Sequence, residues 1–381
     1  MEVECITGWD ELAGLAPYWT ALARGVPFRS WSWLGAWWRL YGHADDHGGP
    51  RRLFALAVYD RDQTLVGLAP WCLDSSARQG NVVRFLGSGN VCSDYLSILS
   101  LPDHEAEVAD ALADWLCQEP CAENPPWNVL MLSGVDAGDR VTCRFIEQMI
   151  ARGSLAWSQP GPNCWRIDLP PSWDDYLASL SKSHRKQVRR LERRLFATGR
   201  AVVRIGSDPA DLDRGLATLG ELHQRRRGGL GQRGRFADDR FADFHQQVAR
   251  QLLADRLLRL AQVDLDGRPV AAEYQVLGQD VVYAYQSGID PAALDFEPGR
   301  LAMIATLRMA IEQGYRAFDL LRGDEPYKAH WRAHPRPSLQ VSLWSTRAAD
   351  RFRGGAWRAG LQVRHWLRAG WKRAAALAQV V

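Results

Sequence analysis

Apolar and polar positions follow the same order of patterns in the two halves of the chain. Each half contains two short apolar runs separated by a polar turn, at Asp60 to Thr64 in the first half and at Asp264 to Arg268 in the second. The second turn contains Asp266-Gly267, a strong hairpin signal. Each pair of runs therefore predicts a β-hairpin. The runs are Leu53 to Tyr59, Leu65 to Trp71, Leu257 to Val263 and Pro269 to Leu277.

Each hairpin is followed by a predicted strand, a helix and a further strand. This repeated order predicts a mixed α/β fold with two tandem domains of similar topology. Gln159-Pro160-Gly161-Pro162 separates them, so we expect domains at 1–160 and 161–346 and a C-terminal helix at 347–381. The elements are Asp94 to Leu99, Glu105 to Cys117 and Asn128 to Ser133, then Val281 to Gly288, Gly299 to Gln313 and Arg316 to Leu321.

Composition limits the class of protein. The chain has 381 residues, 46% of them hydrophobic, and a net charge of only +3, which does not favour a DNA-binding protein. Its seven cysteines form no CxxC pair, which favours reduced thiols over a disulfide framework or a zinc site. No apolar run reaches the ~20 residues that span a bilayer, and no leader pattern is present. We expect a cytoplasmic protein, with the inner face of the membrane as a possible location.

Basic residues are concentrated in three segments. Trp173 to Leu195 is predicted as one long helix, on which two rows of Lys and Arg recur every fourth residue. Arg225 to Arg235 combines arginines and glycines in a predicted loop. Arg351 to Lys372 has an apolar stripe beside basic positions. Each segment is open to two interpretations: contact with an anionic partner or membrane, or an ordinary solvated surface.

The segment from Val281 to Trp331 carries the clearest chemical signal. A strand is followed by Pro298-Gly299 and then by a predicted helix. The first N–H groups of a helix have no internal partners and carry partial positive charge, so this order of elements predicts a site for an anion. A phosphorylated cofactor is the ligand that this arrangement favours.

A polar cluster follows the next predicted strand. Functional groups often gather at strand ends in α/β sheets, and Arg and Lys suit phosphate contact. His330 and His334 are four residues apart, but Pro335 and the lack of a third ligand argue against a metal site. The cluster consists of Asp319, Arg322, Asp324, Tyr327 and Lys328.

Together these motifs resemble the acetyltransferase domain of the CelD-type proteins associated with cellulose and exopolysaccharide biosynthesis. That family is a branch of the GNAT-like superfamily and is related to the Fem-type peptidyltransferases. The resemblance extends from about Ser183 to Lys328; the first half is similar more loosely, as a degenerate GNAT-like domain. The matching segments are Ser183 to Arg190, Leu222 to Arg226, Asp266 to Ala272, Phe296 to Gly299, Phe318-Asp319 and Arg322 to Lys328.

The resemblance implies transfer of an acyl group from acetyl-CoA or another acyl-CoA to an amine, without a metal. Such a reaction needs a base, a donor to the carbonyl oxygen and an acid for the thiolate. For this implied reaction we expect Glu273, Tyr285, Asp319 and Tyr327 as catalytic residues. The expected cofactor-binding residues are Pro298, Gly299, Arg300, Arg322 and Lys328, and the expected substrate-binding residues are His184, Arg185, Arg189, His223 and Asp324.

The acceptor implied is an amino group of a sugar, amino acid or cell-envelope or exopolysaccharide precursor. Further expected partners are an anionic membrane or a polysaccharide synthase complex. Two alternatives remain: a Fem-like transferase that uses aminoacyl-tRNA, and a non-catalytic accessory protein of polysaccharide synthesis.

Overall fold

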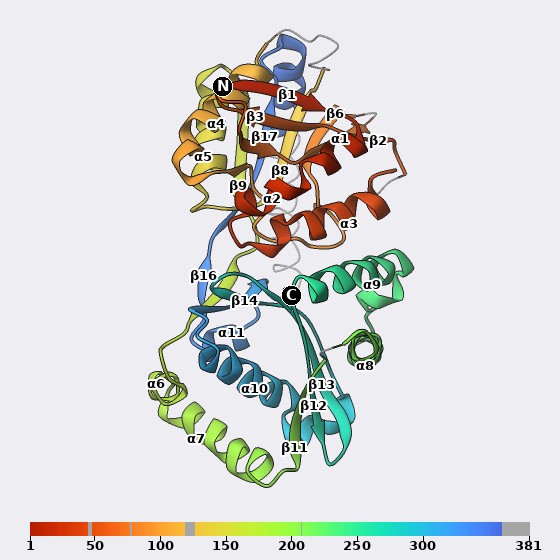
Figure 1. Cartoon of the computed structure of the whole chain (residues 1–381), viewed down its shortest axis with the longest axis vertical. Helices are drawn as coiled ribbons and strands as arrows, with labels where there is room; N and C mark the ends of the chain where they lie inside the picture. Colours follow the sequence, from red (N-terminus) through yellow and green to blue (C-terminus); the bar gives the residue numbers. More distant parts are fainter. Residues whose placement is uncertain (45–47, 77, 119–125, 207, 360–381) are drawn as a thin grey trace, which may run out of the picture.

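The computed structural model describes residues 1–44, 48–76, 78–118, 126–206 and 208–359. It forms three sheets with helices between and around them, which confirms the predicted mixed α/β class (Figure 1). The red-to-yellow first half and the green-to-blue second half lie one above the other in this view.

The first half is built on two sheets. One has the strand order β1-β3-β4-β7, and the other has the order β2-β5-β6-β8-β17-β9. Its elements are β1 (Glu2–Ile6), α1 (Trp9–Gly14), α2 (Ala16–Ala23), η1 (Pro27–Arg29), α3 (Trp31–Tyr41), β2 (Arg51–Leu53), β3 (Ala55–Tyr59), β4 (Leu65–Ala69), β5 (Trp71–Ser76), β6 (Gly80–Phe85), β7 (Leu99–Ser100), η2 (Pro102–His104), α4 (Glu105–Leu116), β8 (Val129–Asp136), α5 (Arg140–Ala151) and β9 (Leu155–Pro160).

The second half is built on one sheet with the order β11-β12-β13-β14-β15-β10-β16. Its elements are β10 (Cys164–Asp168), α6 (Trp173–Ser179), α7 (Lys182–Leu191), the π-helical turn η3 (Glu192–Phe196), β11 (Ala201–Ile205), α8 (Pro209–Gly228), η4 (Arg235–Ala237), α9 (Asp239–Ala254), β12 (Leu258–Leu265), β13 (Arg268–Leu277), β14 (Val281–Ile289), η5 (Pro291–Phe296), α10 (Pro298–Glu312), β15 (Ala317–Arg322), α11 (Tyr327–His330) and β16 (His334–Arg336), followed by β17 (Ser338–Trp344).

The two halves exchange their last strands. β10 follows β9 in the chain but lies between β15 and β16 in the second sheet. β17 follows β16 but lies between β8 and β9 in the first half, where it appears as a blue strand among yellow ones (Figure 1). The segment 338–344 was assigned to the second domain from the sequence, and the structure places it in a sheet of the first half. Two chain crossings therefore tie the halves together.

The exchange makes the repeat visible. β6 and β8 are a parallel pair in the first half, as β14 and β15 are in the second. β8 is followed by α5 and β9, and β15 by α11 and β16. In both halves the exchanged strand sits beside the second member of the parallel pair. This shared topology supports the tandem arrangement that the sequence pattern predicted.

The sheet of the second half is covered on both faces. α8 and α9 lie on one face, and α6, α7 and α10 on the other (Figure 1). The strand β13 contributes to two cores: Tyr274 and Val276 belong to the core shared with the first half, whereas Val270 and Ala271 belong to the core under α10. The packing of the two halves therefore reaches the same strand from which Glu273 projects.

Two predicted elements differ in the structure. The predicted strand at Asp94 to Leu99 is an irregular segment, and only Leu99–Ser100 pairs as β7. The long helix predicted from Trp173 to Leu195 is divided into α6 and α7 and ends in a π-helical turn. Ser181 causes the break between the two helices, because its extended backbone and its side chain cap α7 at the N–H of His184.

The C-terminal helix predicted at 347–381 lies largely outside the described residues. Residues 348–359 are helical, and Trp357 packs against Trp157 and Trp344. Within the described ranges, no helix combines the length and apolar character needed to cross a membrane.

Candidate active site

The parallel strands β14 and β15 pair over a short length. Their paired positions run from Val281 opposite Ala317 to Tyr283 opposite Asp319. Two residues further along, Tyr285 is the extra residue of a bulge between β14 and β13. A bulge bends its strand and leaves one residue without a ladder partner. The bulge therefore lies just beyond the last position at which β14 pairs with β15.

The start of α10 has the features of an anion site. Its first turn contains no acidic residue, and the helix begins directly with Pro298 and Gly299. A Cβ at Gly299 would find only the Ile289 side chain, at 3.9 Å, so the backbone here faces open space. The preceding Glu297 adopts a left-handed conformation (φ 58°) and forms ion pairs with Arg190 and Arg300. Two cations therefore adjoin the first turn, with one acid between them.

Glu273 is a buried carboxylate under α10. The residue is 6% exposed and accepts a hydrogen bond from Nε2 of Gln275 at 2.9 Å. Burial raises the pKa of the Glu273 carboxyl, while hydrogen bonding to Gln275 and Thr306 acts in the opposite direction. A carboxylate in this setting accepts a proton more readily than one in water. Its burial also excludes an ordinary solvent-facing position for Glu273 on the strand.

Tyr327 stands at the first position of the one-turn helix α11. The residue is 48% exposed. Its pKa is raised by desolvation and by the nearby carboxylates of Glu325 and Glu273. The electrostatic effect of Glu273 on this phenol links the two side chains across the space between β13 and α11.

Tyr285 and Asp319 connect the two halves. The Tyr285 hydroxyl donates to the carbonyl of Val91. The fully buried Asp319 accepts from the Tyr95 hydroxyl at 2.5 Å and from Nε of Arg166 at 3.2 Å. Burial raises the pKa of Asp319 and these partners lower it. Both predicted catalytic side chains thus form contacts that hold the first half against the second.

The side chains of Arg322 and Lys328 also donate their hydrogen bonds to groups within the protein. Nε of Arg322 donates to Asp94 at 2.6 Å, and Nη2 donates to the carbonyl of Ser93 at 2.8 Å. The Lys328 ammonium is buried and donates to three successive carbonyls, those of Leu321, Arg322 and Gly323, at 2.9 to 3.1 Å. Their polar atoms are engaged within the protein rather than directed to the start of α10.

The two predicted histidines brace neighbouring elements. Nδ1 of His184 lies 2.9 Å from the carbonyl of His330, and Nδ1 of His223 lies 3.0 Å from the carbonyl of Ser287. Burial lowers the pKa of both rings. Gly288 permits this close approach of α8 to β14, because a Cβ at Gly288 would lie 2.6 Å from the backbone nitrogen of His223.

The remaining predicted substrate residues lie at the surface. Arg185 and Arg189 project from α7, and Arg189 is 3.8 Å from Asp174. Asp324 accepts hydrogen bonds from Asn163 and from the indole of Trp165, which lower its pKa. It fastens the β9–β10 crossing to the end of β15.

Several contributing residues gave no signal in the sequence. Asp94, Tyr95 and Arg166 are far from Asp319 and Arg322 along the chain, so no local spacing relates them. Thr306 offered a weak signal as a polar residue inside an otherwise apolar helix face. Among the described residues, no group of three or more His, Cys, Asp or Glu side chains is arranged to hold a metal ion.

Known proteins share this architecture. The crystal structure of FemX superposes on 91% of this chain and 97% of the FemX chain, with 14% sequence identity and a TM-score of 0.62. A conserved protein of unknown function from Bacteroides thetaiotaomicron VPI-5482 covers 90% and 100% at 12% identity, with a TM-score of 0.56. The C-terminal domain (DUF2156) of a putative lysylphosphatidylglycerol synthetase from Agrobacterium fabrum covers 92% and 96% at 10% identity, with a TM-score of 0.51. At these identities the likeness concerns the fold.

No curated protein is significantly similar in sequence to this chain. Residues 182–329 match the family described as acetyltransferase (GNAT) domain. The matched region begins with α7 and ends in α11, so it contains Glu273, the start of α10 and Tyr327. The second half is thus similar to a GNAT-like acetyltransferase domain over most of its length, and this similarity supports an acyltransferase.

Proposed function

We propose that the protein transfers an acyl group from an acyl-CoA to an amino group of a sugar, an amino acid or a cell-envelope or exopolysaccharide precursor. One observation carries the proposal: β14 and β15 pair at only three positions, and after β14 the short segment η5 leads into α10, whose first turn has no acidic residue. This arrangement offers backbone N–H groups to a pyrophosphate and a space beside the strands for the thioester arm.

The chemistry follows from the side chains nearby. A neutral amine attacks the thioester carbon, so that a C–N bond forms and the C–S bond breaks. Glu273 takes the proton lost by the amine, directly or through water, and the Tyr327 hydroxyl gives a proton to the departing thiolate. The raised pKa of Glu273 strengthens it as a base in its ionised form. The bulged backbone at Tyr285 is the candidate donor to the carbonyl oxygen.

Isothermal titration of the full chain with acetyl-CoA and with longer acyl-CoA thioesters tests the donor. We expect saturable heat with at least one thioester. S-acetyl-N-acetylcysteamine is the matched control, because it keeps the thioester and part of the pantetheine arm but lacks the phosphates. If the start of α10 binds the pyrophosphate, this control binds much more weakly. Absence of heat with every acyl-CoA, on folded protein, would contradict the proposal.

A second candidate donor is aminoacyl-tRNA, and the basic face of α7 favours it. Lys182, Arg185, Lys186 and Arg189 are spaced so that they share one side of this helix. Binding of tRNA through such a face weakens steeply as salt increases, because phosphate contacts release counterions. A titration of tRNA at low and high salt distinguishes the donors. Weak tRNA binding that does not depend on salt, together with binding of acyl-CoA, would exclude aminoacyl-tRNA as the donor.

A further inference from the structure

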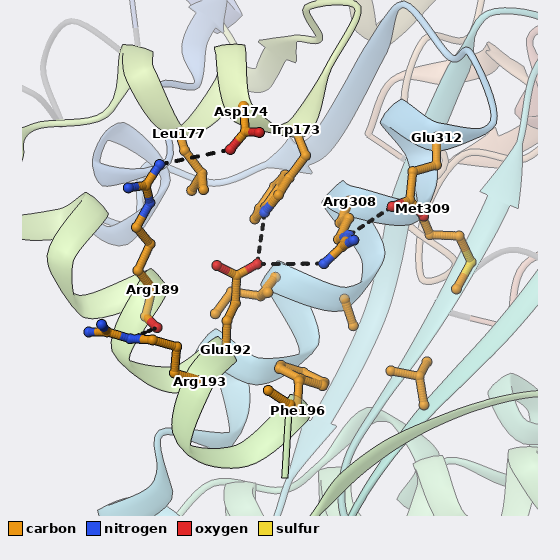
Figure 2. A pocket seen from close by; sticks show the side chains of 14 residues that line it. Trp173, Asp174, Leu177, Arg189, Glu192, Arg193, Phe196, Arg308, Met309 and Glu312 are labelled. Carbon is orange, nitrogen blue, oxygen red and sulfur yellow. Dashed lines mark hydrogen bonds and ion pairs between the residues drawn. The ribbon is translucent and has the colours of Figure 1, made fainter. Parts of the chain in front are cut away.

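A cavity lies between α6, the π-helical turn after α7, and the outer face of α10. We call it the α6–α10 cavity; its volume is about 710 Å³. Figure 2 shows Trp173 and Leu177 on one side and Phe196 on the other, with Arg308 and Met309 of α10 between them. Val203 and Ile304 complete an apolar lining. A cavity of this size is within the range of small-molecule sites.

The acids that line the cavity are Asp174, Glu192 and Glu312, and each already has a partner; Asp174 lies 3.8 Å from Arg189. Glu192 accepts from the Trp173 indole at 2.8 Å and lies 3.8 Å from Arg308, as the dashed lines in Figure 2 show. Nε of Arg308 donates to Glu312 at 2.7 Å. Glu192 and Glu312 therefore do not add unpaired negative charge that would repel an anion at the rim.

The cavity depends on an uncommon backbone form. The N–H of Ala197 donates to the carbonyl of Glu192, five residues earlier, at 2.8 Å. Such π turns are rare and are often found at functional sites. Here the widened turn contributes Glu192, Arg193, Phe196 and Ala197 to the lining.

The cavity continues into a basic surface hollow on α7. Its volume is about 540 Å³, and it shares Arg189, Glu192 and Arg193 with the α6–α10 cavity. The other lining residues are Lys182, Arg185 and Lys186. Five cations face one acid in this hollow, and that acid is paired with Trp173 and Arg308. The hollow therefore suits a phosphate group, while the adjoining cavity suits an apolar chain.

We propose that this combined site binds an anionic phospholipid of a membrane surface. The headgroup phosphate lies on the α7 hollow, and an acyl chain enters the α6–α10 cavity. Charge complementarity favours an anion, and the aliphatic lining from Leu177, Val203, Ile304 and Met309 favours an alkyl chain over a nucleic-acid base. An RNA backbone would bind the cations, but it has no alkyl group to fill the apolar cavity. The site is separate from Glu273 and is independent of the proposed acyl transfer.

Co-sedimentation of the full chain with vesicles tests the proposal. We expect binding to phosphatidylcholine vesicles that contain phosphatidylglycerol and little binding to phosphatidylcholine alone. Lys182→Glu combined with Lys186→Glu should weaken binding by about tenfold or more, since each basic residue near an anionic surface contributes on the order of 1 kcal/mol. Arg227→Glu combined with Arg233→Glu, on the exposed end of α8 and the loop after it, is the matched control and should retain binding.

A second pair of variants tests the cavity itself. Ala197 is exposed and lines the cavity, so Ala197→Trp fills it without disturbing the core. Ala217→Trp places the same ring on an exposed position of α8 as a control. We expect only Ala197→Trp to reduce vesicle binding and the affinity for dihexanoyl phosphatidylglycerol. Circular dichroism and thermal unfolding confirm that each variant is folded.

Three outcomes would overturn the proposal. The first is equal binding to both kinds of vesicle. The second is loss of binding in the α7 variant with no effect of Ala197→Trp, which would reduce the site to a charged surface. The third is displacement of the lipid by glycerol 3-phosphate alone, or tRNA binding that depends on the α7 lysines without any vesicle binding, because the apolar cavity would then have no part.

Discussion

The two halves differ most at one equivalent point, the helix that leads into the second member of the parallel strand pair. In the first half this is α4, whose first turn contains Glu105. Glu105 is 8% exposed and forms ion pairs with Arg24 at 2.5 Å and Arg140 at 3.1 Å. In the second half it is α10, whose first turn has no acid and includes Gly299. Neither helix start has a side-chain cap, but in α4 the acid is the first helical residue, whereas in α10 the acid Glu297 stands before the helix and the first turn carries no negative charge.

A second difference follows the parallel strands. β8 leads into the twelve-residue helix α5, whereas β15 leads into the four-residue helix α11. The short α11 begins with the half-exposed Tyr327. The first half also contributes the irregular segment that includes Val91, Asp94 and Tyr95, and this segment occupies one side of the gap next to β14. The comparison indicates that the first half supports the site structurally, whereas the second half carries the candidate catalytic residues.

The largest effect is expected from Glu273→Gln. Loss of the base should lower kcat by about 10²- to 10⁴-fold while acyl-CoA affinity changes little. The matched control is Glu105→Gln, which alters a buried acid of the first half and should leave kcat of the folded protein near the wild-type value. Steady-state kinetics checks both variants. Comparable losses of kcat in the two variants would contradict the assignment of catalysis to the second half alone. Full activity of Glu273→Gln would favour the alternative of a non-catalytic accessory protein.

The next effect concerns the contact between the halves. Asp319→Ala leaves the Arg166 guanidinium and the Tyr95 hydroxyl without their buried partner, so we expect a loss of about 3–5 kcal/mol in the free energy of unfolding. Asp213→Ala removes the exposed pair with Arg250 and should cost less than about 1 kcal/mol. Chemical denaturation measures the difference. Similar costs for the two variants would show that Asp319 is not a structural residue.

His245 provides a pH-dependent test of the same interface. It is 1% exposed, lies among Trp33, Tyr274 and Tyr285, and neither ring nitrogen has a hydrogen-bond partner. Burial lowers its pKa to about 3. Because the unfolded ring binds a proton near its ordinary pKa, stability is lost as pH falls below about 6.5, by about 3 kcal/mol near pH 4.5.

His245→Phe should remove this part of the acid sensitivity. The measurement is the difference in unfolding free energy between wild type and variant at several pH values, in which the contributions of other groups cancel. A difference that stays constant between pH 7 and pH 4.5 would contradict the prediction.

The smallest effect is expected at the start of α10. Gly299→Glu introduces into α10 the kind of acid that α4 already has, and it should weaken acyl-CoA binding by about tenfold, or about 1.4 kcal/mol. Gly299→Ala is the control, since its Cβ meets only Ile289 at 3.9 Å. Isothermal titration compares them. Unchanged affinity in Gly299→Glu would mean that the donor phosphates bind elsewhere.

Local patterns predicted those parts of the fold that depend on local physics. The hairpin around Asp266-Gly267 and the helix beginning at Pro298 were confirmed, because turn chemistry and apolar periodicity act over a few residues. The break at Ser181 was missed because the stripe of Leu177, His184 and Val188 continues in phase across it. The placement of β17 in a sheet of the first half was missed because pairing between distant strands leaves no local signal.

The sequence by itself determined the elements, the acid-free helix start at Gly299 and the residue types available for acyl transfer. Only the tertiary structure decided the fate of the polar cluster near Lys328, since burial and partners depend on segments hundreds of residues away in the chain. It placed Asp319, Arg322 and Lys328 in structural contacts and left Glu273 and Tyr327 as the pair beside α10. A side chain's chemistry is fixed by its type, but its availability is fixed by what packs against it.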